Sequence, residues 1–150
     1  MLLMTKQLTD IVELLGNKYL PSDANTTSKG VSRAWVAPIV NDDIILDDAV
    51  SSGDVYELLE KDEVVEMALR SGAIALYTCG WGAPIKDDSN YDDEVAPSQH
   101  PERKRIVLLV CVNNLGEKVS TMRIGDDKEL VTTHDGRGAL MDAMETLFSN

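Results

Sequence analysis

The sequence predicts a single α+β domain in which helices pack on a mostly antiparallel sheet of about four strands. The 150 residues suit one domain, and a hydrophobic fraction of 43% can fill one core. Helical patterns lie at the N-terminus, in the middle and at the C-terminus, whereas most strand-like segments are grouped together, which favours α+β over α/β. The grouped strand segments are 73–79, 105–112, 117–124 and 129–133.

The chain is predicted to begin with a short helix and an exposed loop. Over residues 5–15, apolar side chains recur at i, i+3, i+4 and i+7, and Gly16 is the expected stop. These apolar residues are Leu8, Ile11, Val12 and Leu15. Small polar residues fill 21–33, which predicts an exposed loop. In the next segment, 34–40, Pro38 restricts any strand to a sheet edge or a short piece.

The middle helical pattern has clear start and stop signals. Asp54, with Glu57 three residues later, resembles a capping box. Apolar residues then keep helical spacing, but Asp62 interrupts the stripe, so the segment is either one helix or two that are broken near Lys61. Gly72 is the expected C-cap.

The second half of the chain contains the predicted centre of the sheet. The run RIVLLVCV at 105–112 is apolar on both alternating faces, which is typical of a strand covered on both sides. Residues 113–116, NNLG, predict a hairpin that pairs 106–112 with 117–124. Asp135 is the expected N-cap of the last helix. That helix has an apolar stripe of Leu140, Met141, Met144, Leu147 and Phe148.

Acidic residues are concentrated in one part of the chain. Residues 42–66 contain ten acids and one base, Lys61, and therefore carry −9 of the total charge of −12. Such a field repels polyanions and attracts cations or basic proteins. We expect no direct nucleic-acid binding, because the one basic patch is the short run at 103–105. A role of these acids in solubility alone explains the same composition.

Cysteine usage and hydropathy predict a cytoplasmic protein. Cys79 and Cys111 lie in apolar, strand-like segments and make no disulfide framework, which favours reduced thiols. No apolar stretch approaches the roughly 20 residues that a membrane span needs, and the start does not resemble a signal peptide. The sequence indicates no cofactor, and it is compatible with a homo-oligomer.

The segment CGWGAPI at 79–85 is a candidate ligand-binding turn. It follows a predicted strand, and two glycines flank Trp81, whose indole face could hold a ligand. A turn whose tryptophan covers a sheet edge explains the same residues. The polar segment 86–103 is longer than an ordinary connection, and we expect it to form an exposed, mobile loop.

The catalytic and metal-binding alternatives rest on few residues. Cys79 could act as a nucleophile with His100 or His134 as its base, although such a cysteine is more often a small buried residue. A zinc site would need both cysteines and both histidines, whose spacings match no compact zinc motif. The calcium-like alternation at 88–92 lacks the glycine and the glutamate of an EF-hand loop. The sequence therefore predicts no metal site.

Three segments resemble a group of uncharacterised small proteins from actinobacteria and their phages. They are TCGWGAPI at 78–85, APSQHPERKRIVLLV at 96–110 and HDGRGALMDAMETLF at 134–148. The shared pattern is a turn, a polar loop with Ser-x-His-Pro-x-Arg, an apolar strand and a final helix. Gly82 stands where the group has alanine. The resemblance implies no activity, but it makes His100 and Arg103 one candidate unit.

We expect a small acidic interaction or regulatory protein rather than an enzyme. It would dock on a basic surface of a protein partner, and mimicry of nucleic-acid phosphates is one form of this hypothesis. The alternative is a Cys/His-dependent hydrolase or transferase centred on the turn at 79–85. The expected partner-binding residues are Asp54, Glu57, Glu60 and Glu63, and the candidate ligand-turn residues are Trp81, His100 and Arg103.

Overall fold

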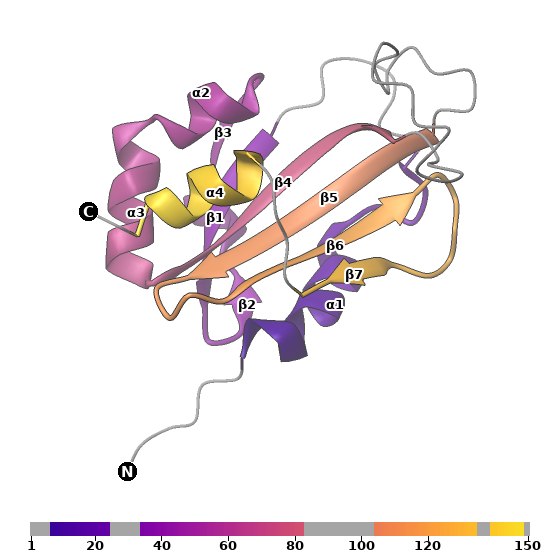
Figure 1. The fold of residues 1–150 in the computed structure, drawn as a ribbon, viewed down its shortest axis with the longest axis horizontal. Coiled ribbons are helices and arrows are strands. Elements are labelled where there is room, and N and C mark those ends of the chain that lie inside the picture. The colour runs from indigo at the N-terminus through magenta and orange to yellow at the C-terminus, as the bar shows by residue number, and fades with distance from the viewer. Residues whose placement is uncertain (1–6, 25–33, 83–103, 135–138, 149–150) are drawn as a thin grey trace, which may run out of the picture.

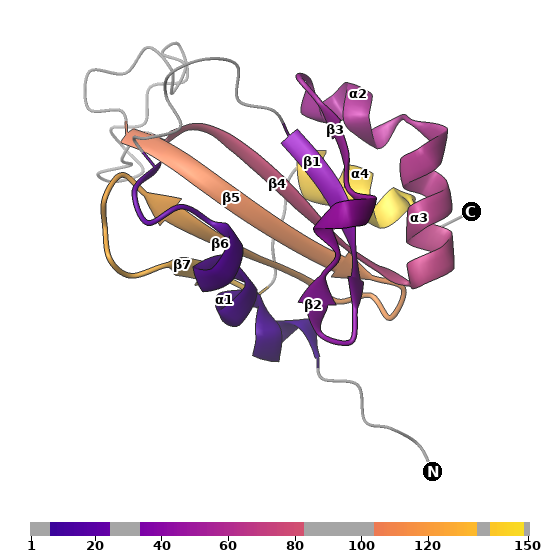
Figure 2. The same ribbon diagram turned by 180° about the vertical axis from the view of Figure 1, so that it is seen from behind.

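A curled antiparallel sheet forms the centre of this computed structural model, which describes residues 7–24, 34–82, 104–134 and 139–148. One helix packs on one face of the sheet, and three described helices lie on the other face (Figures 1 and 2). The predicted α+β class is therefore confirmed.

The described residues form seven strands rather than about four. Their spatial order is β2–β1–β4–β5–β6–β7, with β3 also paired to β1, and every pairing is antiparallel. The strands are β1 (Ala34–Val40), β2 (Asp43–Ile44), β3 (Val50–Ser52), β4 (Ala73–Gly82), β5 (Lys104–Asn113), β6 (Lys118–Ile124) and β7 (Val131–Thr133). The sequence did not predict β2 and β3 because each is too short to show an alternating pattern.

Strand β1 lies inside the sheet although it contains Pro38. It pairs with β4 on one side, and on its other side β3 pairs with its first three residues and β2 with its last two. The Pro38 carbonyl accepts a hydrogen bond from the N–H of Ile45 at 3.0 Å. Because N–H and C=O of one strand residue point to the same side, the missing N–H of Pro38 points away from β4. The prediction of an edge strand or a short piece is wrong, since the proline faces the gap between β2 and β3.

Strand β5 is buried on both faces, as predicted. Val107, Leu109 and Cys111 belong to the core on one side, whereas Val110 and Val112 belong to the core on the other. The pairing with β6 runs from Ile106 opposite Ile124 to Val112 opposite Lys118, which confirms the predicted hairpin. Two separate cores therefore share this one strand.

Helix α1 (Leu8–Tyr19) packs against β5 and β6 and continues past Gly16, where the sequence predicted its end. Its predicted apolar stripe is buried. A Cβ atom on Gly16 would lie 2.6 Å from Cγ2 of Thr121 and 2.9 Å from Cδ1 of Leu130. The glycine therefore serves close packing of the helix backbone on the sheet instead of ending the helix.

The opposite face of the sheet is covered by α2 (Val55–Leu59), α3 (Asp62–Ser71) and α4 (Ala139–Thr146). The helical conformation is interrupted at residues 60–61, so the segment forms two helices, α2 and α3. Asp54 Oδ1 accepts hydrogen bonds from the N–H groups of Tyr56 and Glu57 at 2.8 and 3.3 Å, which confirms the Asp54 half of the predicted capping box. The N–H of Asp54 donates to Ser52 Oγ at 3.3 Å. Gly72 ends α3 with a φ of 74°, as predicted. None of the described helices is long and apolar enough to span a membrane.

Much of the two predicted loops lies outside the described residues. This holds for all of 86–103 and for 25–33, and also for the predicted N-cap Asp135. Within the described part of the first loop, Ser22 is exposed. Ala24 is buried, and its N–H donates to the carbonyl of Gly125 at 2.7 Å. Ala24, the last described residue of this loop, is therefore anchored to the turn after β6.

The C-terminal end of α1 is tied to β2 by Asp43. Its carboxylate accepts hydrogen bonds from Lys18 Nζ at 2.8 Å and from the hydroxyl of Tyr19 at 2.6 Å. These two hydrogen bonds, with that from Lys18 the larger effect, lower the pKa of Asp43 from 3.8 to about 2. The ionised carboxylate is the form that connects helix and strand.

We predict that Gly16→Ala destabilises the protein although alanine favours helices. Overpacking against Thr121 should cost about 1–3 kcal/mol, whereas the gain in helix propensity is about 1 kcal/mol. Chemical denaturation would measure the difference in the free energy of unfolding. Gly80→Ala is the matched control, since nothing lies within 4 Å of a Cβ there. Equal stability of both variants would contradict the packing role of Gly16.

We predict that Asp43 contributes to stability only where it is ionised. Its pKa is lowered in the folded state, so its contribution is present above about pH 4 and is lost as the pH falls towards about 2. The melting temperature of the wild type should exceed that of Asp43→Asn at pH 6, and the gap should narrow between pH 4 and pH 2. A gap that stays constant over this range would contradict the prediction.

Candidate functional site

The acidic stretch 42–66 is divided among separate parts of the fold. Asp42 and Asp43 lie at the β1–β2 turn, and Asp47 and Asp48 lie in a short 3-10 helix, Leu46–Asp48. The remaining six acids lie on α2, α3 or directly before them and are exposed: Asp54, Glu57, Glu60, Asp62, Glu63 and Glu66. The field that the sequence predicts therefore has its densest part on α2 and α3.

The acids of α2 and α3 face solvent because the apolar sides of both helices face the sheet. Leu58 and Val64 are fully buried. Over residues 54–70 there are six acids and two bases, Lys61 and Arg70, so this surface carries a net charge of −4. All four predicted partner-binding residues are exposed on it. Asp54 is also occupied in capping α2, which leaves the three glutamates as the freer charges.

Two large apolar side chains are exposed on the same helices. Tyr56 is 51% exposed and Leu69 is 53% exposed. Tyr56 is four residues before Glu60, and Leu69 is three residues after Glu66, so each shares a helix face with an acid. Aromatic and apolar side chains of this kind supply contact area that a purely solubilising surface does not need.

Helix α4 adds two acids to the same side of the sheet. Asp142 is exposed, Glu145 is half-buried, and the helix packs against α2 and β5. Both acids are more than 70 residues from the stretch 42–66 in the sequence. Their i, i+3 spacing opposite the apolar stripe was the signal that places both on the outer face of the helix.

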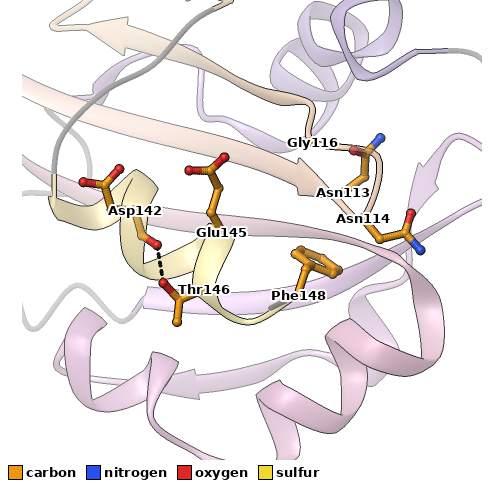
Figure 3. A pocket seen from close by; sticks show the side chains of 7 residues that line it. All are labelled: Asn113, Asn114, Gly116, Asp142, Glu145, Thr146 and Phe148. Atoms are coloured by element: carbon orange, nitrogen blue, oxygen red, sulfur yellow. Dashed lines mark hydrogen bonds between the residues drawn. The ribbon is translucent and has the colours of Figure 1, made fainter. Parts of the chain in front are cut away.

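A groove of about 460 Å³ lies between α4 and the turn at 113–116 (Figure 3). Its lining residues are Asn113, Asn114, Gly116, Asp142, Glu145, Thr146 and Phe148. Lys118 Nζ lies 3.3 Å from Glu145 Oε2, and Thr146 donates a hydrogen bond to the carbonyl of Asp142 at 2.8 Å. Carboxylates, amides and one aromatic ring in one groove form a set that suits a cationic side chain.

A second groove, of about 320 Å³, lies beside the same turn, and six of its twelve lining residues are apolar, so we call it the apolar groove. Its apolar lining comes from α1, β1 and the ends of β4 and the turn: Leu8, Ile11, Ile39, Val40, Ala73 and Leu115. Asp42 is also one of its lining residues. Asn113 and Asn114 line both grooves, so the grooves adjoin at one end of the sheet. We call this region, with its two grooves and the turn at 113–116, the sheet end.

The sheet end is built on a tightly bonded turn. Asn113 Oδ1 accepts hydrogen bonds from the N–H groups of Leu115 and Glu117, both at 3.0 Å, and its Nδ2 donates to Glu117 Oε1 at 2.8 Å. The N–H of Asn114 donates to the carbonyl of Gly72 at 2.9 Å, which connects the turn to the end of α3. Leu115 itself is 79% exposed. This apolar side chain is therefore held in solvent by a fixed backbone.

Residues 79–82 continue β4 and do not form a turn. They pair with β5 as far as Gly82 opposite Lys104, because the backbone there stays extended. The predicted turn at 79–85 is therefore wrong over these four residues, and 83–85 lie outside the described chain. Cys79 is half-buried, and Arg105 Nη2 lies 3.8 Å from its Sγ. The side chain of Trp81, like His100 and Arg103, lies outside the described part.

The structure does not bring Cys79 and His134 together. Cys79 is in β4, whereas His134 is exposed and follows β7, with β5 and β6 between these strands. From the register, the two positions are about 14 Å apart across the strands and about 13 Å apart along them. A hydrogen bond between this thiol and this imidazole is excluded by the separation. A pairing of Cys79 with His100 lies outside the described residues.

Cys111 has no features of a reactive thiol. It is fully buried near the C-terminal end of β5, and burial raises the pKa of its thiol to about 12. Across the described ranges, no cluster of three or more His, Cys, Asp or Glu side chains could hold a metal ion.

No protein-family model, curated protein or solved structure matches this chain. The resemblance of residues 78–148 to small actinobacterial and phage proteins therefore stays a prediction. The residues of the sheet end and of the acidic helices must be interpreted from their own chemistry.

We predict that the two thiols differ strongly in reactivity. Cys79 should react with an aromatic disulfide reagent at pH 8 in the folded protein, since it is partly accessible. Cys111 should react only after unfolding, because it is buried and its pKa is raised. Absorbance would count one thiol before denaturation and two after it. Reaction of both thiols at similar rates in the folded protein would contradict the burial of Cys111.

Proposed function

We propose that this chain is an acidic interaction protein that docks through α2 and α3 on a basic surface of a protein partner. The observation that carries the proposal is the density of exposed carboxylates on these helices, six acids against two bases over residues 54–70. Charges arranged in this way steer a basic partner and speed its association. The free thiols of Cys79 and Cys111 favour the cytoplasm as the place of action.

The two exposed apolar side chains favour docking over solubility alone. A solubilising surface is best built from charges without large apolar groups, whereas interfaces combine aromatic or aliphatic contacts with a charged rim. Tyr56 and Leu69 meet that description because each lies beside exposed carboxylates. They would supply the desolvated contacts after the charges have oriented the partner.

Mimicry of nucleic-acid phosphates is the finer form of this proposal. Residues 54–66 contain six acids and one base, and the acids are exposed on two separate helices, α2 and α3, and their flanking residues. This density of exposed carboxylates supports a partner whose basic surface normally binds nucleic acid.

Charge reversal of Glu57, Glu60 and Glu63 to lysine should slow association with the partner at least about tenfold and change dissociation much less, because steering acts on encounter. The partner would first be captured from the native host with the wild-type chain and identified by mass spectrometry. Rates would then be measured by surface plasmon resonance at two salt concentrations. Association of the wild type should weaken with salt, since exposed charges are screened beyond about 8 Å at physiological ionic strength.

The matched control is the reversal of three exposed acids elsewhere, Glu13, Asp126 and Glu129. Both triple variants change the net charge by +6, so any difference between them reports the position of the charges. Unfolding measurements should show intact folds, because changes of exposed charges usually cost under about 0.5 kcal/mol each. Equal association rates for the two triple variants would leave solubility as the role of the acids on α2 and α3.

A further inference from the structure

We propose that the sheet end is the anchoring site for a basic peptide segment of the partner, with an aliphatic side chain in the apolar groove and a cationic side chain at Asp142 and Glu145. This inference rests on the proposed function and names the site that would bind the most deeply buried residues of the partner. It is carried by the two adjoining grooves and by the charges around them.

The apolar groove favours an aliphatic side chain of the partner as its occupant. Its lining brings side chains of α1, β1 and the turn together, and Val40 and Leu115 remain 43% and 79% exposed. Its volume of about 320 Å³ is at the lower end of the roughly 300–1,000 Å³ that is common for ligand pockets. One or two aliphatic side chains would remove these apolar surfaces from water.

The charges around the grooves favour a positively charged segment as the occupant. Asp42 lines the apolar groove, and Asp142 and Glu145 line the other groove. Within the described residues that line the two grooves there is no lysine or arginine, and the nearby Lys118 is paired with Glu145. An anionic or neutral segment would leave Asp42 and Asp142 without a counter-charge, whereas a lysine or arginine would pair with them and add to the positive charge that Lys118 already places at Glu145.

The turn between the grooves makes the site preformed. Asn113 uses its side-chain oxygen and nitrogen within the turn, and the backbone of Asn114 is bound to Gly72. In Figure 3, Phe148 lies between α4 and these two asparagines, where its ring can contact the alkyl part of a lysine. A preformed site binds without the cost of ordering its own residues.

The sheet end also adjoins the acidic helices. Helix α3 leads through Ser71 and Gly72 directly into the lining of the apolar groove. A partner that lies along α2 and α3 can therefore extend one segment over the turn without a long connection. Charge complementarity thus selects one occupant for both regions, a basic partner chain.

Two labelled peptides of equal charge, KKLLKK and KKSSKK, would test the inference by fluorescence anisotropy with the full chain. The wild type should bind the leucine peptide at least about fivefold more tightly, because burial of aliphatic surface adds to the charge attraction. Leu115→Asn should remove this preference. Asp142→Asn with Glu145→Gln should weaken binding of both peptides at least about tenfold.

Asp126→Asn with Glu129→Gln is the matched control, since these exposed acids have the same i, i+3 spacing and lie in the turn at the opposite end of β6. It should weaken binding less than about twofold, because only the general field changes. NMR spectra should show the leucine peptide shifting the side-chain amide of Asn114. Thermal melts of every variant would show that the fold is kept.

Several outcomes would overturn the inference. These are equal binding of the two peptides, equal weakening by the two double variants, or shifts confined to α2 and α3. If the chain self-associates and the peptides compete with this self-association, the site belongs to a second copy of the chain. If the double variant Leu2→Asp, Leu3→Asp binds the peptides more tightly than the wild type, the site belongs to the chain's own first residues.

The proposed function is tested separately with the variant in which Glu57, Glu60 and Glu63 are lysines. If this variant loses the captured partner while Asp142→Asn with Glu145→Gln keeps it, docking on α2 and α3 stands and the anchoring site falls. If only the sheet-end variants lose the partner, the anchoring site stands and the docking surface is misplaced.

Discussion

The burial of β5 on both faces is the constraint on which the rest of the structure depends. One set of its side chains packs against α1, and the alternate set belongs to the core that α2, α3 and α4 cover. Because side chains of a strand alternate, a shift of one residue in its register would exchange the two cores. This register directly positions α1 and α4, which pack on β5, whereas α2 and α3 pack mainly on β1, β3 and β4.

The same arrangement distributes the net charge unevenly between the two faces. Within the described residues, helices α2 to α4 and their flanking residues hold seven of the fourteen exposed acids, while α1 contains Asp10 and Glu13 against Lys18. Sequence position alone did not indicate this division. Residues 42–66 are continuous in the chain but are separated in space, whereas Asp142 is remote in sequence yet lies on the same side of the sheet as Glu57. The surface that a partner meets is therefore set by the topology.

The strong periodic elements could be predicted from the sequence, and the short or sterically determined ones could not. The stripe of α3, the caps at Asp54 and Gly72 and the hairpin of β5 and β6 each follow from local patterns. Gly16 was misinterpreted because a helix stop and a close helix–sheet contact both favour glycine, and only the position of Thr121 separates them. The two grooves could not be predicted, since their walls come from segments that are distant in sequence.

The margins of the sheet restrict the ways in which this protein can recognise another chain. One margin consists of β2 and β3, which have two and three residues and are interrupted opposite Pro38, and the other consists of the three-residue β7. Such short and broken edges offer few consecutive backbone groups to an added strand. Recognition by strand addition, which reads backbone hydrogen bonds, is therefore disfavoured at these two margins. The shortness of β2, β3 and β7 also limits edge-to-edge pairing between copies of the chain there.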